Sequence, residues 1–172
     1  VNLANRLCEN YDVQIYSICG KEKNPLYQMN SNIHIEFANN KNRRIRQLLF
    51  ENRKKFNVYL KRNSIDIAFL IGAYSGGITA LSQPVVKTKF VFCDHGALMN
   101  QWKEKDITVL RWIASKLSDR TVVLTDRTKN DYIEKFHINS RKILRIYNWV
   151  NTNKSEMSLD YNINSKKIVT VG

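Results

Sequence analysis

The fold is decided by residues 65–96, IDIAFLIGAYSGGITALSQPVVKTKFVFCDHG. Two runs in it, residues 65–71 and 89–93, are short and rich in β-branched and aromatic side chains, which predicts strands. Between them, residues 77–82 predict a helix that ends before Pro84, because proline cannot continue a helix. A strand, a helix and a second strand in this order are typical of two parallel strands joined by a crossover helix.

The same alternation extends over the rest of the chain. Apolar residues at helical spacing predict helices, and short β-prone runs predict strands. The expected helices cover residues 1–8, 42–60, 107–117 and 128–136, and the expected further strands cover 11–19, 33–37, 121–124, 143–146 and 167–171. Apolar strands that alternate with helices predict an α/β fold with a Rossmann-like, doubly wound parallel sheet.

Composition limits the class of protein. The 172 residues, 43% of them hydrophobic, are enough for one packed domain without disulfides or metal. Cys8, Cys19 and Cys93 form no CxxC pair, so neither a disulfide framework nor a zinc site is expected. The longest apolar run is far shorter than the roughly 20 residues of a membrane-spanning helix, and no signal segment opens the chain. We therefore expect a cytoplasmic domain.

Charge is the strongest compositional signal, because 28 Lys and Arg face 15 Asp and Glu, for a net charge of +13. Such a surface attracts anionic partners. The helix expected at residues 42–60 carries a candidate patch for an anionic membrane or another polyanion, formed by Arg43, Arg44, Arg46, Arg53 and Lys54. The alternative is an ordinary solvated helix face in a Lys-rich chain. Nucleic acid is disfavoured, since no RNA-binding or helix-turn-helix motif is present.

The candidate site begins at Asp94-His95-Gly96, which directly follows the predicted strand 89–93. Parallel α/β sheets gather their binding groups at the carboxyl ends of the strands. Histidine donates or accepts a proton near neutral pH, and glycine lets the backbone approach a ligand. The alternative is a loop histidine that makes only a structural hydrogen bond.

A hydrolase is a second interpretation. Residues 73–77, AYSGG, approximate the nucleophile elbow G-x-S-x-G at a strand-to-helix turn. Ser75 would then be the nucleophile, and its acid and base would come from Asp119, Asp126 or Asp131 and from His137. The simpler alternative is that Gly76 and Gly77 only make the turn. A non-catalytic, membrane-docking domain is the third possibility.

Other cofactor chemistry is disfavoured. The chain has neither a G-x-G-x-x-G fingerprint nor a phosphate-binding P-loop. His34 and His137 have no partner at metal-ligand spacing, so we expect them to be structural or solvent-facing. The sequence thus predicts no metal and no cofactor.

Five segments together resemble the N-terminal domain of a family 4 glycosyltransferase with the GT-B fold. VNLANRL at the start is similar to the helix that follows the family's glycine-rich first loop, and FVFCDHG is similar to the strand that ends in the family's histidine. The other three segments are IDIAFLIGAY, TVVLTDRTKNDYIEKF, and ILRIYNWVN followed by KKIVTVG.

The resemblance implies a retaining transfer of a sugar from a nucleotide-sugar donor to a glycan or lipid-linked acceptor, as in polysaccharide and cell-envelope biosynthesis. It places His95 opposite the donor sugar as the catalytic candidate. It also implies that Asp94, Gly96, Thr125 and Asn148 contribute to substrate binding. A basic face fits a protein that meets its acceptor at the inner face of a membrane.

The resemblance also sets expected domain boundaries. Residues 1–165 would be the acceptor-side domain, without its first strand and glycine-rich loop, because the chain opens inside a helix. Residues 166–172 would begin, or lead into, the domain that binds the nucleotide-sugar. Since the family holds its donor in that second domain, we expect this chain alone to be inactive.

Overall fold

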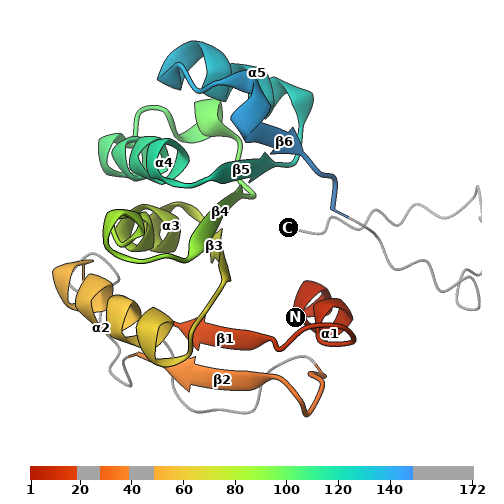
Figure 1. Ribbon diagram of the computed structural model, residues 1–172. Coiled ribbons are helices and arrows are strands. Elements are labelled where there is room, and N and C mark those ends of the chain that lie inside the picture. Colours follow the sequence, from red (N-terminus) through yellow and green to blue (C-terminus); the bar gives the residue numbers. More distant parts are fainter. Residues whose placement is uncertain (19–27, 39–48, 149–172) are drawn as a thin grey trace, which may run out of the picture.

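The computed structural model describes residues 1–18, 28–38 and 49–148. Its strands form two sheets in which every pairing is parallel, one of order β1-β2 and one of order β3-β4-β5-β6 (Figure 1). The strand bounds are β1 Gln14–Ser17, β2 His34–Phe37, β3 Ile67–Ile71, β4 Lys89–Asp94, β5 Arg120–Val123 and β6 Ile143–Arg145.

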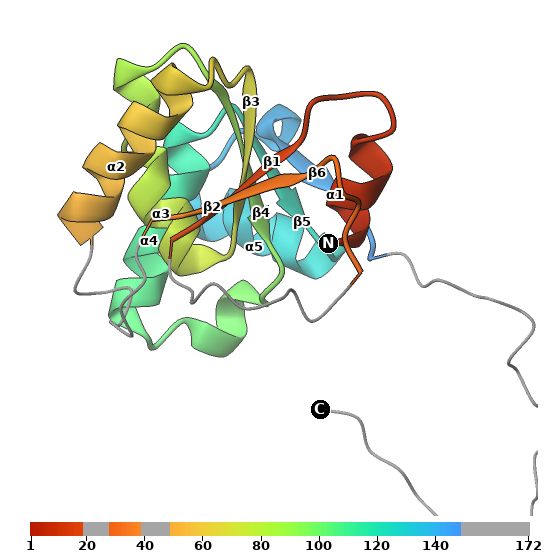
Figure 2. The same cartoon turned by 90° about the horizontal axis from the view of Figure 1, so that it is seen from below.

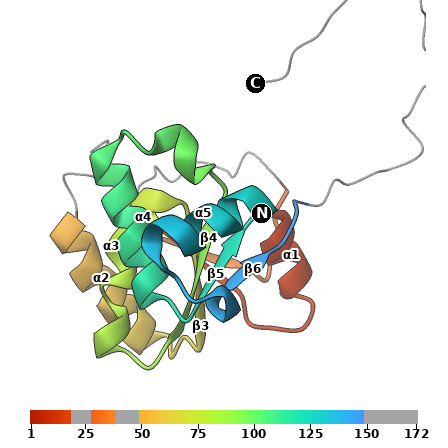
Figure 3. The same ribbon diagram turned by 90° about the horizontal axis from the view of Figure 1, so that it is seen from above.

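From β3 onward, a helix joins each strand to the next, as parallel crossovers require. The helix bounds are α1 Asn2–Leu7, α2 Leu49–Arg62, α3 Ala73–Ala80, α4 Lys105–Leu117 and α5 Asp126–Phe136, with short 3-10 turns η2 Gln83–Val85, η3 Leu98–Gln101 and η4 Ser140–Lys142. Figures 2 and 3 show α2, α3 and α4 on one side of the strands and α1 on the other. None of the described helices is long and apolar enough to cross a membrane.

The predicted elements in the described residues are present, with ends shifted by a few positions. The Rossmann-like α/β fold is confirmed by the four-stranded parallel sheet and its helices. The predicted strand 167–171 and the first part of the helix predicted at 42–60 lie outside the described residues.

One prediction was wrong. The helix expected at residues 77–82 is α3, which already begins at Ala73, so Gly76 and Gly77 lie inside the helix and do not make the turn. The turn is made by Gly72, whose φ of 81° favours glycine. Gly76 and Gly77 serve close packing instead. A Cβ on Gly76 would lie 2.6 Å from the ring of Phe92, and one on Gly77 would lie 2.6 Å from Cβ of Leu110.

The core lies between the sheets and the helices α2 to α5. Aromatic side chains dominate it: Phe90 and Phe92 of β4 are fully buried, and Phe90 faces Phe56 of α2 with ring centroids 6.2 Å apart. Tyr132 and Phe136 of α5 meet edge to face at 5.2 Å. Such rings contribute both buried area and specific geometry, and they fix the helices over the sheet.

The opposite face of the four-stranded sheet carries exposed apolar side chains. On β3, Ile67, Phe69 and Ile71 are 56%, 45% and 50% exposed, and Leu144 of β6 is 46% exposed. Parallel sheets are normally covered on both faces. Within the described residues, α2 to α5 cover one face of this sheet, and α1 is the only helix on the other side of the strands (Figure 2).

Candidate functional site at the carboxyl edge of the sheet

Because β3 to β6 are all parallel, the segments that follow them emerge at one edge of the sheet. Backbone hydrogen bonds tie these segments to neighbouring strands. The amide of Gly72, after β3, donates to the Cys93 carbonyl at 3.0 Å, and the amide of Ile146, after β6, donates to the Val123 carbonyl at 2.9 Å. These hydrogen bonds fix the backbone at the carboxyl edge, so side chains on it can be held in place.

His95 is the first residue after β4, and its side chain is exposed. The residues before and after it are both held in place. Asp94 before it ends the strand and is 1% exposed, while the amide of Gly96 after it donates to Asp94 Oδ1 at 3.1 Å. The exposed imidazole is thus carried by a short, well-anchored loop.

The carboxylate of Asp94 points into the helical layer, away from solvent. Its Oδ2 accepts a hydrogen bond from the Tyr132 hydroxyl at 2.7 Å. The Arg111 guanidinium forms an ion pair with the same oxygen, with Nε at 3.0 Å. Burial, followed by the nearby Asp94 carboxylate, raises the pKa of Tyr132 well above its usual range, so this hydroxyl stays a proton donor.

Arg111 of α4 is 2% exposed and links this carboxylate to the next turn of the chain. Its Nη2 donates to Oε1 of Gln101 in η3 at 2.8 Å. The same nitrogen lies where a side chain at position 96 would begin, since a Cβ on Gly96 would be 2.2 Å from it. Any larger residue at position 96 would force the guanidinium to move, because this group packs directly against the Gly96 backbone.

Thr125 and Asn148 follow the next two strands. Thr125 is exposed, and it caps α5 because its Oγ1 accepts from the Thr128 amide at 3.1 Å. This arrangement begins the helix beside His95, since β5 pairs with β4. Asn148 is exposed beyond β6, after Tyr147, whose ring lies 4.3 Å from the Arg145 guanidinium.

The basic patch is described only in part. Arg43, Arg44 and Arg46 lie outside the described residues. On α2, Lys54 is exposed and Arg53 is half-buried. The patch as a whole stays a prediction.

The hydrolase constellation is not assembled. Ser75 lies in the first turn of α3, at the carboxyl edge, and its hydroxyl donates to the carbonyl of Ile71, the last residue of β3. His137 caps the far end of α5, after that helix has returned to the amino edge before β6. The two side chains therefore belong to opposite edges of the sheet, too far apart for proton transfer.

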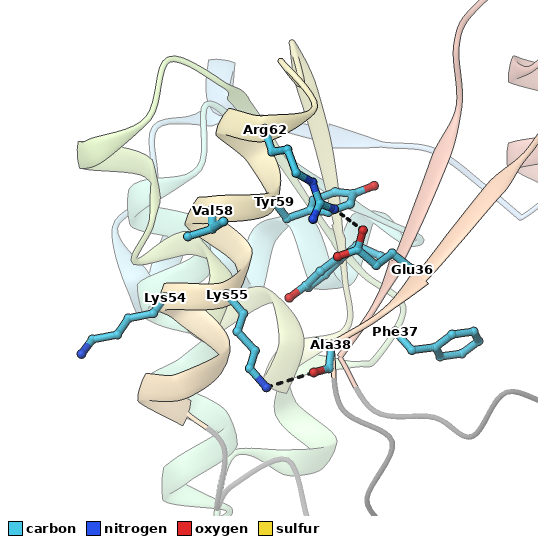
Figure 4. A pocket seen from close by; sticks show the side chains of 9 residues that line it. Glu36, Phe37, Ala38, Lys54, Lys55, Val58, Tyr59 and Arg62 are labelled. Atoms are coloured by element: carbon cyan, nitrogen blue, oxygen red, sulfur yellow. Dashed lines mark hydrogen bonds and ion pairs between the residues drawn. The ribbon is translucent and has the colours of Figure 1, made fainter.

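A cavity of about 350 Å³ lies between α2 and β2 (Figure 4). Arg62 pairs with Glu36 across it, and Lys55 Nζ donates to the Ala38 carbonyl at 3.0 Å. Burial, with a further contribution from Glu36, raises the pKa of Tyr16 and Tyr59 on its wall to about 12. It is separate from the His95 loop, which follows β4 in the other sheet.

The buried partners of Asp94 were not predicted from the sequence. Arg111 occupies the position between Ile107 and Ala114 on the buried stripe of α4, where an apolar side chain is the norm. A charge on such a stripe signals a buried partner of opposite sign.

In the described part of the chain, no group of three or more His, Cys, Asp or Glu side chains could hold a metal ion.

The parallel sheet, its helices and the polar residues at its carboxyl edge define an α/β domain of the kind that binds ligands at strand ends. Residues 1–154 match the family model for Glycosyltransferase Family 4, and the chain belongs to that family. No curated protein matches the chain closely enough to count as a relative. Family membership identifies a glycosyltransferase domain, whose partners are a sugar donor and an acceptor.

Proposed function

We propose that this domain serves the acceptor side of a glycosyltransferase that moves a sugar from a nucleotide-sugar to a glycan or lipid-linked acceptor, with retention of stereochemistry. His95 would face the donor sugar. The observation that carries the proposal is the exposed His95 imidazole on an anchored loop at the carboxyl edge of a family 4 domain. Thr125, on the neighbouring strand end, and Asn148 would contact substrate from the same edge.

The proposal includes a second domain of a GT-B architecture. Residues 1–165 would form the acceptor-side domain, and residues 166–172 would lead toward the domain that binds the nucleotide-sugar. The exposed apolar face of β3 and β6 supports a domain that packs against further polypeptide, because an apolar patch of this kind is unfavourable in water.

Activity of the intact protein tests this function. It is incubated with a set of nucleotide-sugars and a lipid or glycan acceptor extract, and release of the nucleoside phosphate and labelled product are measured. We expect one donor to be consumed with a product of unchanged anomeric configuration. Consumption of none, by a protein shown to be folded, would contradict the proposal.

The proposal also locates the protein in the cytoplasm, at the inner face of the membrane. Replacing Arg43, Arg46, Arg53 and Lys54 by Glu is expected to abolish binding to anionic vesicles at low salt, because each basic side chain near such a surface contributes about 1 kcal/mol. Co-sedimentation with vesicles measures this. The matched control converts Arg120, Arg127, Lys129 and Arg141, which α2 does not carry, to Glu. Unchanged binding by the first variant would rule out the patch.

A further inference from the structure

We propose that Asp94, Arg111 and Tyr132 form a positioning cluster, which fixes the backbone on both sides of His95 and thereby sets the direction of its imidazole. The catalytic consequence rests on the function proposed above, whereas the positioning itself does not. The cluster reassigns Asp94, expected from the sequence to bind substrate, to a buried role.

The contacts of the cluster converge on the His95 loop from two helices. Arg111 of α4 and Tyr132 of α5 both reach Oδ2 of Asp94, at 3.0 Å and 2.7 Å. Asp94 Oδ1 accepts from the Gly96 amide at 3.1 Å. One carboxylate therefore holds the residue before His95 by its side chain and the residue after it by its backbone.

Removing the polar groups of this cluster from water costs free energy that an apolar core would not lose. Arg111 is 2% exposed, Asp94 1% and Tyr132 0%, so a charged pair and a hydroxyl are fully removed from water. Apolar side chains of similar volume are often as stabilising or more so at such positions. Apolar contacts are not directional and would not orient the His95 loop. Hydrogen bonds and an ion pair are directional, so they fix the angle and register of the loop that they hold.

Gly96 gives independent support. The Arg111 guanidinium occupies the space next to its Cα, where a Cβ would lie 2.2 Å from Nη2. The backbone after His95 is thus packed against the cluster as well as hydrogen-bonded to it. Gln101 Oε1, 2.8 Å from the same nitrogen, holds the guanidinium from the other side.

The test uses Tyr132→Phe and Arg111→Lys in the intact protein. Tyr132→Phe removes one hydroxyl and keeps the ring, and Arg111→Lys keeps the charge but loses the guanidinium contacts. Tyr74→Phe is the matched control, because it removes a tyrosine–aspartate hydrogen bond of 2.8 Å at an exposed site, to Asp106. Histidine-selective ¹³C labelling, with His95→Gln for assignment, reports on the imidazole. Hydrogen–deuterium exchange of peptides over residues 94–101 reports on the loop.

We expect both cluster variants to shift or broaden the His95 ring signal and to speed exchange of the loop about tenfold, with His34 and His137 unchanged. In the transfer assay, kcat should fall about tenfold while KM for the donor stays near wild type, because a misdirected imidazole affects the reaction more than binding. The control should change neither readout.

A wild-type His95 signal and wild-type exchange in both variants would overturn the positioning role of the cluster. An altered loop with unchanged kcat would overturn its catalytic consequence. Absence of transfer by the wild-type protein would instead count against the proposed function. In that case the ring signal and the exchange rates still decide whether the cluster holds the loop.

Discussion

Gly77→Ala is expected to destabilise the domain by about 2 kcal/mol or more, although alanine is the better helix former by about 1 kcal/mol. The new Cβ would lie 2.6 Å from Leu110 Cβ and 2.7 Å from the Leu110 carbonyl oxygen. A backbone atom cannot move aside as a side chain does, so α3 and α4 must separate. Urea unfolding followed by circular dichroism measures the change.

Gly76→Ala provides the comparison. Its Cβ would meet only side chains closely, at 2.6 Å from the Phe92 ring. Shortening that ring by Phe92→Leu in the same protein should recover part of the lost stability, whereas no side-chain truncation at Leu110 should fully rescue Gly77→Ala. A Gly77→Ala protein more stable than wild type would refute this packing.

Asp94→Ala is expected to cost about 3–5 kcal/mol, because it leaves the buried Arg111 charge without its counter-ion and the Tyr132 hydroxyl without its acceptor. Denaturant unfolding again measures the loss. Asp66→Ala, at an exposed position just before β3, is the control and should change stability little.

The double variant of Asp94→Ala and Arg111→Leu separates the effect of the unpaired charge on stability from the effect of lost packing. Adding Arg111→Leu to Asp94→Ala removes the stranded charge and should regain much of the lost stability. A cost below about 1 kcal/mol for Asp94→Ala alone would mean that the pair is not the buried unit described here.

The order of elements followed from periodicity, because parallel strands are short apolar runs and the helices between them carry apolar stripes. The position of His95 at a strand end followed from the same alternation, since β4 ends at the residue before it. Both inferences depend on local sequence, where backbone preference and burial agree.

The contacts between residues far apart in the chain could not be predicted from the sequence. Nothing local distinguishes a turn glycine from a packing glycine, and Gly76 and Gly77 are explained only by Phe92 and Leu110, which come from other elements. Likewise, nothing in the sequence near Asp94 indicated its partners on α4 and α5, which lie 17 and 38 residues further along the chain.

The most direct measurement is the rate of sugar transfer by His95→Ala in the intact protein, beside His137→Ala as a matched control at the opposite edge of the sheet. Loss of a side chain that acts on the reacting sugar should lower kcat at least about 100-fold. We expect that loss for His95→Ala and a rate close to wild type for His137→Ala. Transfer by His95→Ala at the wild-type rate would contradict a catalytic site at this edge.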